Sequence, residues 1–152
     1  MYKRQPYASG VALHVEAIRE SAAKHMEEYD IRATSIDMTV GTLSGGNQQK
    51  VIVARELGRE VRLLVANQPT RGLDVGSIEF VHNQIVSARD HGTAVLICST
   101  ELDEIYALAD RIVVMYEGKI AGERPPSVSI EELGLLMAGA GAAGTVHEAQ
   151  PA

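Results

Sequence analysis

A serine and two glycines stand directly before a helical stretch, and these residue types could hold an anion. Ser44, Gly45 and Gly46 precede apolar residues that recur at helical spacing from residue 48 onward. Free backbone N–H groups at a helix start, together with a serine hydroxyl, form a positive end that suits a phosphate oxygen. The alternative is a flexible loop that only caps the helix. The flanking Leu43 and the extension Gln48-Gln49-Lys50 favour the phosphate site.

Further polar residues follow two apolar, strand-like runs. Residues 61–66 form the first run, and Asn67, Gln68 and Pro69 follow it, with the proline closing the strand. Residues 93–98 form the second run, which Ser99 and Thr100 follow. Taken alone, the residues after the first run are also compatible with a simple polar turn.

Three other groups of residues indicate structural roles. The histidines have no metal-ligand spacing, so we expect surface positions and no metal site for His14, His25, His82, His91 and His147. Cys98 lies in an apolar run and is expected to be a small core residue. Glu101, Asp103 and Glu104 are expected to form a solvated helix face rather than paired catalytic acids.

Alternating helix and strand patterns must position these residues. Helical spacing predicts helices over 11–29, 48–57, 78–88, 101–110 and 130–137, the last with Ser129 as its N-cap and the second ended by Gly58. Apolar runs predict strands over 61–66, 93–98 and 112–116, and Glu117-Gly118 predicts a tight turn into a short strand over 119–123. This alternation indicates an α/β fold with a parallel sheet covered on both faces.

The composition excludes several classes of protein. The chain has 152 residues, 45% hydrophobic and 22% charged, which is typical of one globular domain. A net charge of -6 without a basic stripe argues against a protein that tracks nucleic acid. The lone Cys98 cannot form an internal disulfide and suits a reducing compartment. The longest uncharged stretch, residues 133–146, is too short and glycine-rich to span a membrane, so we expect a cytosolic chain.

Four motifs, in this order, resemble those of ATP-binding-cassette (ABC) ATPases. Residues 43–50 (LSGGNQQK) resemble the signature motif in its sugar- and nucleoside-importer variant, and residues 63–70 (LLVANQPT) resemble the Walker B strand. Residues 71–74 are similar to the D-loop and residues 99–101 to the switch region. The resemblance covers residues 11–137 and implies a P-loop NTPase-like parallel sheet with part of the helical subdomain. It also implies ATP and Mg²⁺ as cofactors of the complete assembly.

Three departures from the family pattern imply a degenerate hydrolysis site. The family's Walker B strand ends in Asp-Glu, where the Asp reaches Mg²⁺ and the Glu polarises the attacking water; this chain has Asn67 and Gln68. An amide is a weak partner for Mg²⁺ and cannot take a proton. The switch position, usually His, is Thr100. Gln68 and Thr100 are therefore the degenerate base and switch positions, and Asn67 is a degenerate nucleotide-site residue.

The intact signature motif implies a role in a different ATP site. In the ABC arrangement two cassettes face head to tail, and each ATP lies between one cassette's phosphate loop and the other's signature motif. The residues expected to complete the partner cassette's site are Ser44, Gly45, Gly46, Asn47 and Gln48. Asp74, in the D-loop, is expected to contact the facing cassette, with a charge at a helix N-terminus as the alternative.

No phosphate loop of the form G-x-x-x-x-G-K-[ST] occurs, so the chain alone is predicted to be inactive. In the family's sheet, the strand before that loop lies between those matching 93–98 and 112–116, so we expect a gap there and exposed apolar strand edges. We expect a helical-subdomain segment over 6–58, half of a catalytic core over 59–137 and a disordered tail over 138–152. Residues 1–5 resemble a translated sequencing adapter and are interpreted as a cloning scar, with a natural start as the alternative.

The resemblance implies the C-terminal part of the second nucleotide-binding domain of an ABC importer for nucleosides or simple sugars. The expected partners are a second cassette fused in the parent chain, membrane permease subunits and, indirectly, a substrate-binding protein, but no nucleic acid. The expected location is the cytoplasmic face of the membrane, as a peripheral subunit. The alternatives are a soluble ABC-type ATPase of translation or DNA repair, and a non-enzymatic fragment that docks on a partner cassette.

Overall fold

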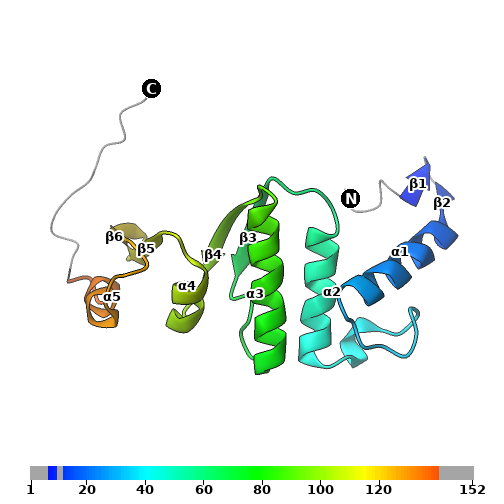
Figure 1. Ribbon diagram of the computed structural model, residues 1–152, viewed down its shortest axis with the longest axis horizontal. Helices are drawn as coiled ribbons and strands as arrows, with labels where there is room; N and C mark the ends of the chain where they lie inside the picture. The colour runs from blue at the N-terminus through cyan, green and yellow to red at the C-terminus, as the bar shows by residue number, and fades with distance from the viewer. Residues whose placement is uncertain (1–6, 10–11, 141–152) are drawn as a thin grey trace. The chain divides into compact units, whose positions relative to one another are not determined.

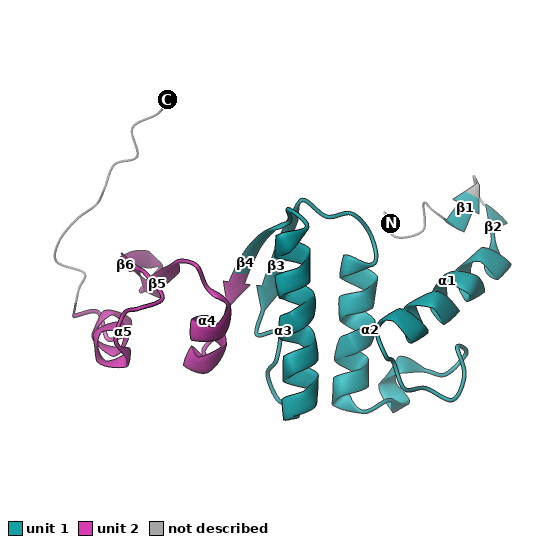
Figure 2. Ribbon diagram, viewed as in Figure 1, with its two compact units in different colours: residues 1–96 teal, residues 97–152 magenta. Residues whose placement is uncertain are grey.

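The computed structural model describes residues 7–9 and 12–140, and the chain divides into two compact units at residues 96 and 97 (Figures 1 and 2). The interpretation of residues 1–5 as a scar lies outside the described residues, and so does the predicted tail over 138–152 apart from residues 138–140, which are described as a turn. Among those described, no helix is both long enough and apolar enough to cross a bilayer.

The first unit contains most of the predicted helices. In chain order its elements are β1 (Ala8–Ser9), β2 (Ala12–Leu13), α1 (Val15–Glu28), the 3₁₀ helix η2 (Val40–Thr42), α2 (Gly45–Leu57), β3 (Leu63–Asn67), α3 (Val75–Asp90) and β4 (Ala94–Cys98), within which the division between the units falls. Helices α2 and α3 contact one another and lie side by side (Figure 1). Their shared core contains Tyr29, Ile31 and Ala54, with Phe80 of α3 packed against it.

Helix α1 starts later than the sequence predicted. Residues 12 and 13 pair with β1 in an antiparallel ladder, so their backbone groups serve a short hairpin instead of the first turn of the helix. No residue of α1 is buried, and Val15 and Ile18 on its predicted apolar face are 57% and 37% exposed. The apolar face therefore packs mainly at its end, where Tyr29 is buried.

Strands β3 and β4 form a parallel pair joined through α3, as the sequence predicted, but the prediction that both faces are covered is wrong. Successive side chains of a strand point to opposite faces. Along β3 and β4, exposed residues alternate with half-buried ones, and Leu63, Val65 and Leu96 are each more than half exposed. Cys98 lies on the exposed side as well, so its prediction as a core residue is also wrong.

Strand β5 (Ile112–Tyr116) belongs to a different sheet from β4, and the predicted gap between them stays a prediction. In the described part of the chain, β4 pairs with β3 alone and β5 pairs with β6 (Lys119–Arg124) alone. The described residues therefore form an α/β fold, with a parallel strand pair, helices and a separate antiparallel hairpin.

The second unit is built on the antiparallel hairpin of β5 and β6. Glu117 and Gly118 both have positive φ, 48° and 75°, which is the pattern of a type I′ turn and confirms the predicted tight turn. Helix α5 (Ile130–Met137) has the predicted bounds, and Ser129 caps it. Leu133 and Leu136 of α5 pack on the inward residues of β5.

One prediction about helix α4 (Leu102–Leu108) and its N-cap is wrong, namely that all three of their acidic residues are solvated. Glu101 and Asp103 are exposed, as expected for a solvated face, but Glu104 is only 4% exposed. Glu104 lies one helical turn before the half-buried Leu108, so it shares the covered side of the helix with an apolar residue. The charge of a residue therefore did not predict its exposure in this short helix.

Candidate functional site

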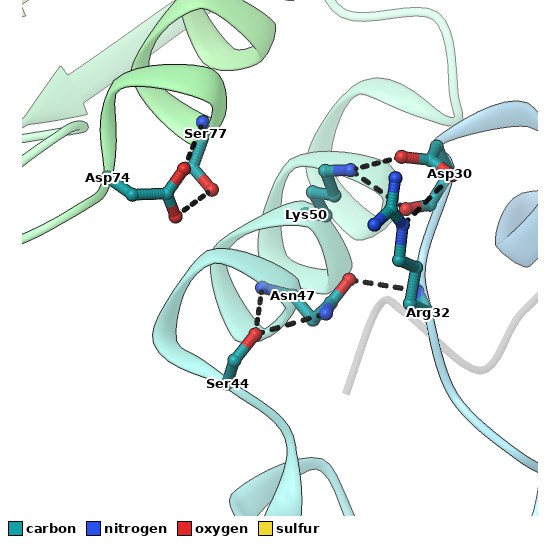
Figure 3. A network of polar contacts seen from close by, with 7 residues as sticks. All are labelled: Asp30, Arg32, Ser44, Asn47, Lys50, Asp74 and Ser77. Atoms are coloured by element: carbon teal, nitrogen blue, oxygen red, sulfur yellow. Dashed lines mark hydrogen bonds and ion pairs between the residues drawn. The ribbon is translucent and has the colours of Figure 1, made fainter.

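Helix α2 begins at the predicted anion site, and Ser44 caps it (Figure 3). Ser44 Oγ accepts hydrogen bonds from the backbone N–H of Asn47 at 3.4 Å and from its side-chain Nδ2 at 3.0 Å. The helix includes both glycines and so begins three residues before the predicted start at residue 48. The first amides of a helix have no intrahelical acceptor, so those of Gly45 and Gly46 stand at the positive end of α2.

The start of α3 lies directly against this helix start. Asp74 is the N-cap of α3: Oδ1 accepts the Ser77 backbone N–H at 3.0 Å and Oδ2 accepts the Ser77 hydroxyl at 2.7 Å. A Cβ at Gly46 would overlap Ser77 Oγ, whereas a Cβ at Gly45 would meet nothing within 4 Å. Asp74 therefore has the capping role that the sequence offered as the alternative, and its contact with a facing cassette stays a prediction. Ser77 was missed, because only the fold brings it to Gly46.

We expect Gly46→Ala to destabilise the chain and Gly45→Ala to leave its stability unchanged or slightly raised. The new methyl group at residue 46 would push Ser77 away from Asp74, and such overpacking costs about 1–3 kcal/mol. At residue 45 the site is open, and alanine favours helix more than glycine does. Urea unfolding of the two variants beside the parent chain measures the difference. Equal midpoints for both variants would contradict the close approach of the two helix starts.

Acid should weaken the cap of α3. The two hydrogen bonds from Ser77 lower the pKa of Asp74 below its ordinary value of 3.8. A carboxyl with a lowered folded-state pKa contributes stability that is complete above the unfolded pKa and is lost as the pH falls through the folded pKa. Asparagine also caps helices but does not titrate. Between neutral pH and about pH 3, the urea midpoint of Asp74→Asn should therefore fall less than that of the parent chain. An equal fall of the midpoint in both proteins would contradict this.

Two glutamines after the glycines hold α2 in place. Gln48 Nε2 donates to the carbonyl of Leu43 at 2.8 Å, and Gln49 Nε2 donates to the carbonyl of Pro69 at 2.8 Å. The second bond links α2 to the loop that follows β3. Gln48 was predicted to contact nucleotide, and in the structure its amide is engaged with its own helix start. Gln49 was missed as a linking residue, because its partner lies 20 positions away.

The residues at the end of β3 lack the groups that a magnesium ion prefers. Asn67 is the exposed last residue of β3, and Gln68 follows in the left-handed region with φ 50°, which is uncommon for a residue other than glycine. Mg²⁺ prefers carboxylates and phosphates, and this pair offers only amides. Within residues 7–9 and 12–140, no cluster of three or more His, Cys, Asp or Glu side chains could hold a metal ion. The residues present here do not fit the Mg²⁺ of an intact site.

The predicted site residues are thus divided between the two units. The first unit brings together the start of α2 and the start of α3, and it also holds Asn67 and Gln68. Thr100, the predicted switch position, is exposed and belongs to the second unit, directly after β4.

No family model matches the chain, but several curated proteins do. It is 49% identical over 139 residues to the guanosine import ATP-binding protein NupO of Bacillus subtilis, which covers 91% of this chain and 27% of that protein. It is 46% identical over 139 residues to the nucleoside import ATP-binding protein NupA of Lactococcus lactis, and 45% identical over 152 residues to the glucose import ATP-binding protein TsgD13 of Haloferax volcanii. The latter two matches cover 91% and 98% of this chain. The chain spans only 27–28% of the length of these relatives.

Solved structures show the same fold. A dimeric ATP-binding cassette in a post-hydrolysis state, bound to ADP and Pi, superposes with a TM-score of 0.64 at 22% identity over 80% of this chain and 52% of that one. An ATP-binding cassette of an ABC transporter superposes with a TM-score of 0.62 at 25% identity over 88% of this chain and 51% of that one. Sequence and fold together place this chain with the ABC-type ATP-binding proteins of nucleoside and sugar importers, a part of whose length it matches.

Proposed function

We propose that this chain acts as part of the ATP-binding subunit of an importer for nucleosides or simple sugars. The observation that carries the proposal is the capped helix start at Ser44, Gly45 and Gly46, in a chain that is 49% identical to a guanosine import ATP-binding protein. In the complete assembly, this helix start faces the ATP of a partner cassette at the cytoplasmic face of the membrane. A solved cassette with the same fold is dimeric and bound to ADP and Pi, which supports the pairing of two cassettes in this proposal.

In this proposal the chain's residues bind and orient the nucleotide and take no proton from water. ATP, when bound between two cassettes, supplies the free energy that drives the transport cycle. The amides of Gly45 and Gly46 and the hydroxyl of Ser44 would hold a phosphate group, because all are donors at the positive end of α2. The packing of Gly46 against Ser77, which Asp74 holds, would keep this helix start in place for the partner.

The chain's own ATP site would bind nucleotide but hydrolyse it poorly. Gln68 cannot act as a general base, since an amide does not take a proton near neutrality. Asn67 supplies no charge to a magnesium ion, and Thr100 has no ring nitrogen to place near the nucleotide. The importer would then contain one site that hydrolyses ATP and one that mainly binds it.

A transplant into a relative tests the proposed function. The 139 matching residues of the guanosine import ATP-binding protein of Bacillus subtilis are replaced by those of this chain, in cells that lack the original protein. We expect guanosine uptake and ATP hydrolysis close to those of the unaltered importer. A chimera that reaches the membrane fraction at the normal level but supports neither would overturn the proposal. Loss of ATP hydrolysis on Ser44→Ala in the chimera would locate the effect at the signature motif.

A further inference from the structure

Asn47 has a fixed orientation because its oxygen faces a group that can only donate. The backbone N–H of Arg32 lies 2.8 Å from Asn47 Oδ1 (Figure 3). An amide nitrogen in that position would set donor against donor, so the oxygen must point to Arg32 and the nitrogen to the other side. That nitrogen, Nδ2, lies 3.0 Å from Ser44 Oγ and donates to it.

This orientation determines what the Ser44 hydroxyl can do. A hydroxyl oxygen has two lone pairs and one hydrogen. The side-chain and backbone N–H groups of Asn47 both donate to Ser44 Oγ, so its two lone pairs are used. Ser44 is exposed, and in both of its side-chain hydrogen bonds to described residues its oxygen is the acceptor, so its hydrogen is not used in them. The free hydrogen therefore points outward, and the hydroxyl offers a donor to whatever lies beyond the helix start.

The segment that holds Asn47 is itself clamped to α2. Lys50 Nζ donates to the carbonyl of Asp30 at 2.8 Å and to its carboxylate at 2.7 Å, and it lies 4.8 Å from the ring centre of Phe80. The Lys50 side chain is only 12% exposed. Asn47 and Lys50 are three residues apart and so lie on one face of α2. From there Asn47 binds Arg32 and Lys50 binds Asp30, so the segment is held at two adjacent points.

We propose that Asn47 is a positioning residue that makes the Ser44 hydroxyl a hydrogen-bond donor, and so matches the helix start to an anion that only accepts, such as a terminal phosphate. The chain of contacts runs from the Arg32 amide through the Asn47 side chain to Ser44 Oγ. This inference rests on the proposed function, in which Ser44 contacts the partner cassette's nucleotide. Asn47 itself need not touch the nucleotide.

The test is a double-mutant cycle for ATP hydrolysis by the assembled importer that carries the chimeric subunit. Asn47→Asp keeps the shape and the bond from Arg32, but its carboxylate accepts the Ser44 hydrogen and turns the hydroxyl inward. We expect a roughly 10–100-fold fall in kcat/KM for ATP, the range for losing a hydrogen bond to a charged group. Asn47→Gln keeps a donor and an acceptor and should therefore retain most of the parent's activity. The melting temperatures of the two variants and of the parent should agree.

The Ser44→Ala background separates the possible outcomes. If Asn47 acts through Ser44, then Asn47→Asp adds little once the hydroxyl is gone. A full, multiplicative further loss would show that the new charge repels the phosphate directly, and it would overturn the inference while leaving the proposed function intact. The neutral Asn47→Leu should fall below the parent but above Asn47→Asp. If Ser44→Ala alone leaves ATP hydrolysis unchanged, the proposed function fails, not merely this addition to it.

Discussion

Replacing Asn67 by Asp and Gln68 by Glu together is expected to raise ATP hydrolysis at the chain's own site by roughly 10²–10⁴-fold, in the chimeric importer described above. The aspartate would supply the negative charge that Mg²⁺ prefers, and the glutamate would supply a base for the attacking water. Both replacements keep the size and shape of the native amides. The left-handed backbone at Gln68 would be retained, because glutamate differs from glutamine only in its terminal group.

The adjacent pair Asn83-Gln84 on α3 provides a matched control. Asn83→Asp with Gln84→Glu makes the same two chemical changes and adds the same charge, but away from the end of β3. The measurement is the number of ATP molecules hydrolysed per assembly in a single turnover. We expect about one for the parent and the control, and about two for the restored site, if the partner cassette is active. An unchanged number would mean that this site either already hydrolyses ATP or lacks more than these two carboxylates.

Local structure could be predicted from the sequence where one residue or one short pattern decides it. The bounds of α5 and its cap at Ser129 agree with the prediction, because a serine before an apolar helical stretch specifies both. The Glu117-Gly118 turn agrees as well, since few residue pairs accept two positive φ angles. The start of α1 could not be predicted, because pairing with β1 decides whether residues 12 and 13 join the helix or a strand.

Burial could not be predicted, because it depends on what lies opposite each side chain. The apolar run that ends at Cys98 has the composition of a strand buried on both faces, yet one of its faces is exposed. Glu104 shows the opposite error, since a charged residue lies on the covered side of α4. In both cases the side chain's own chemistry was read correctly, and its surroundings were not contained in the local sequence.

The candidate site shows the same division between local and distant information. The cap at Ser44 follows from the residue type and its place before the helix, and the sequence predicted it. The sequence did not predict the close approach of Gly46 to Ser77 or the bond from Arg32 to Asn47. These contacts join residues that are 31 and 15 positions apart. A pair of glycines was the only local sign that another element lies against this turn of α2.

Gly45→Asp is expected to separate stability from activity at the same position. Residue 45 opens the first turn of α2, where a negative charge interacts favourably with the helix dipole by typically about 0.3–1 kcal/mol. A side chain fits there, because a Cβ meets nothing within 4 Å. The melting temperature of the chimeric subunit should therefore stay the same or rise.

ATP hydrolysis at the partner cassette's site should fall by roughly 10²–10³-fold in the same variant, the range for losing one preorganised donor at a site of developing charge. The aspartate would place a carboxylate where Gly45 and Gly46 offer amides to a phosphate, and like charges repel. Gly45→Asn has the same size without the charge and should lose much less activity. If Gly45→Asp and Gly45→Asn were equally impaired, the effect would be steric, and the electrostatic account of this helix start would be wrong. If the aspartate variant kept full activity while remaining stable, no phosphate could bind at the start of α2, because an anion cannot share that position with a carboxylate at no cost.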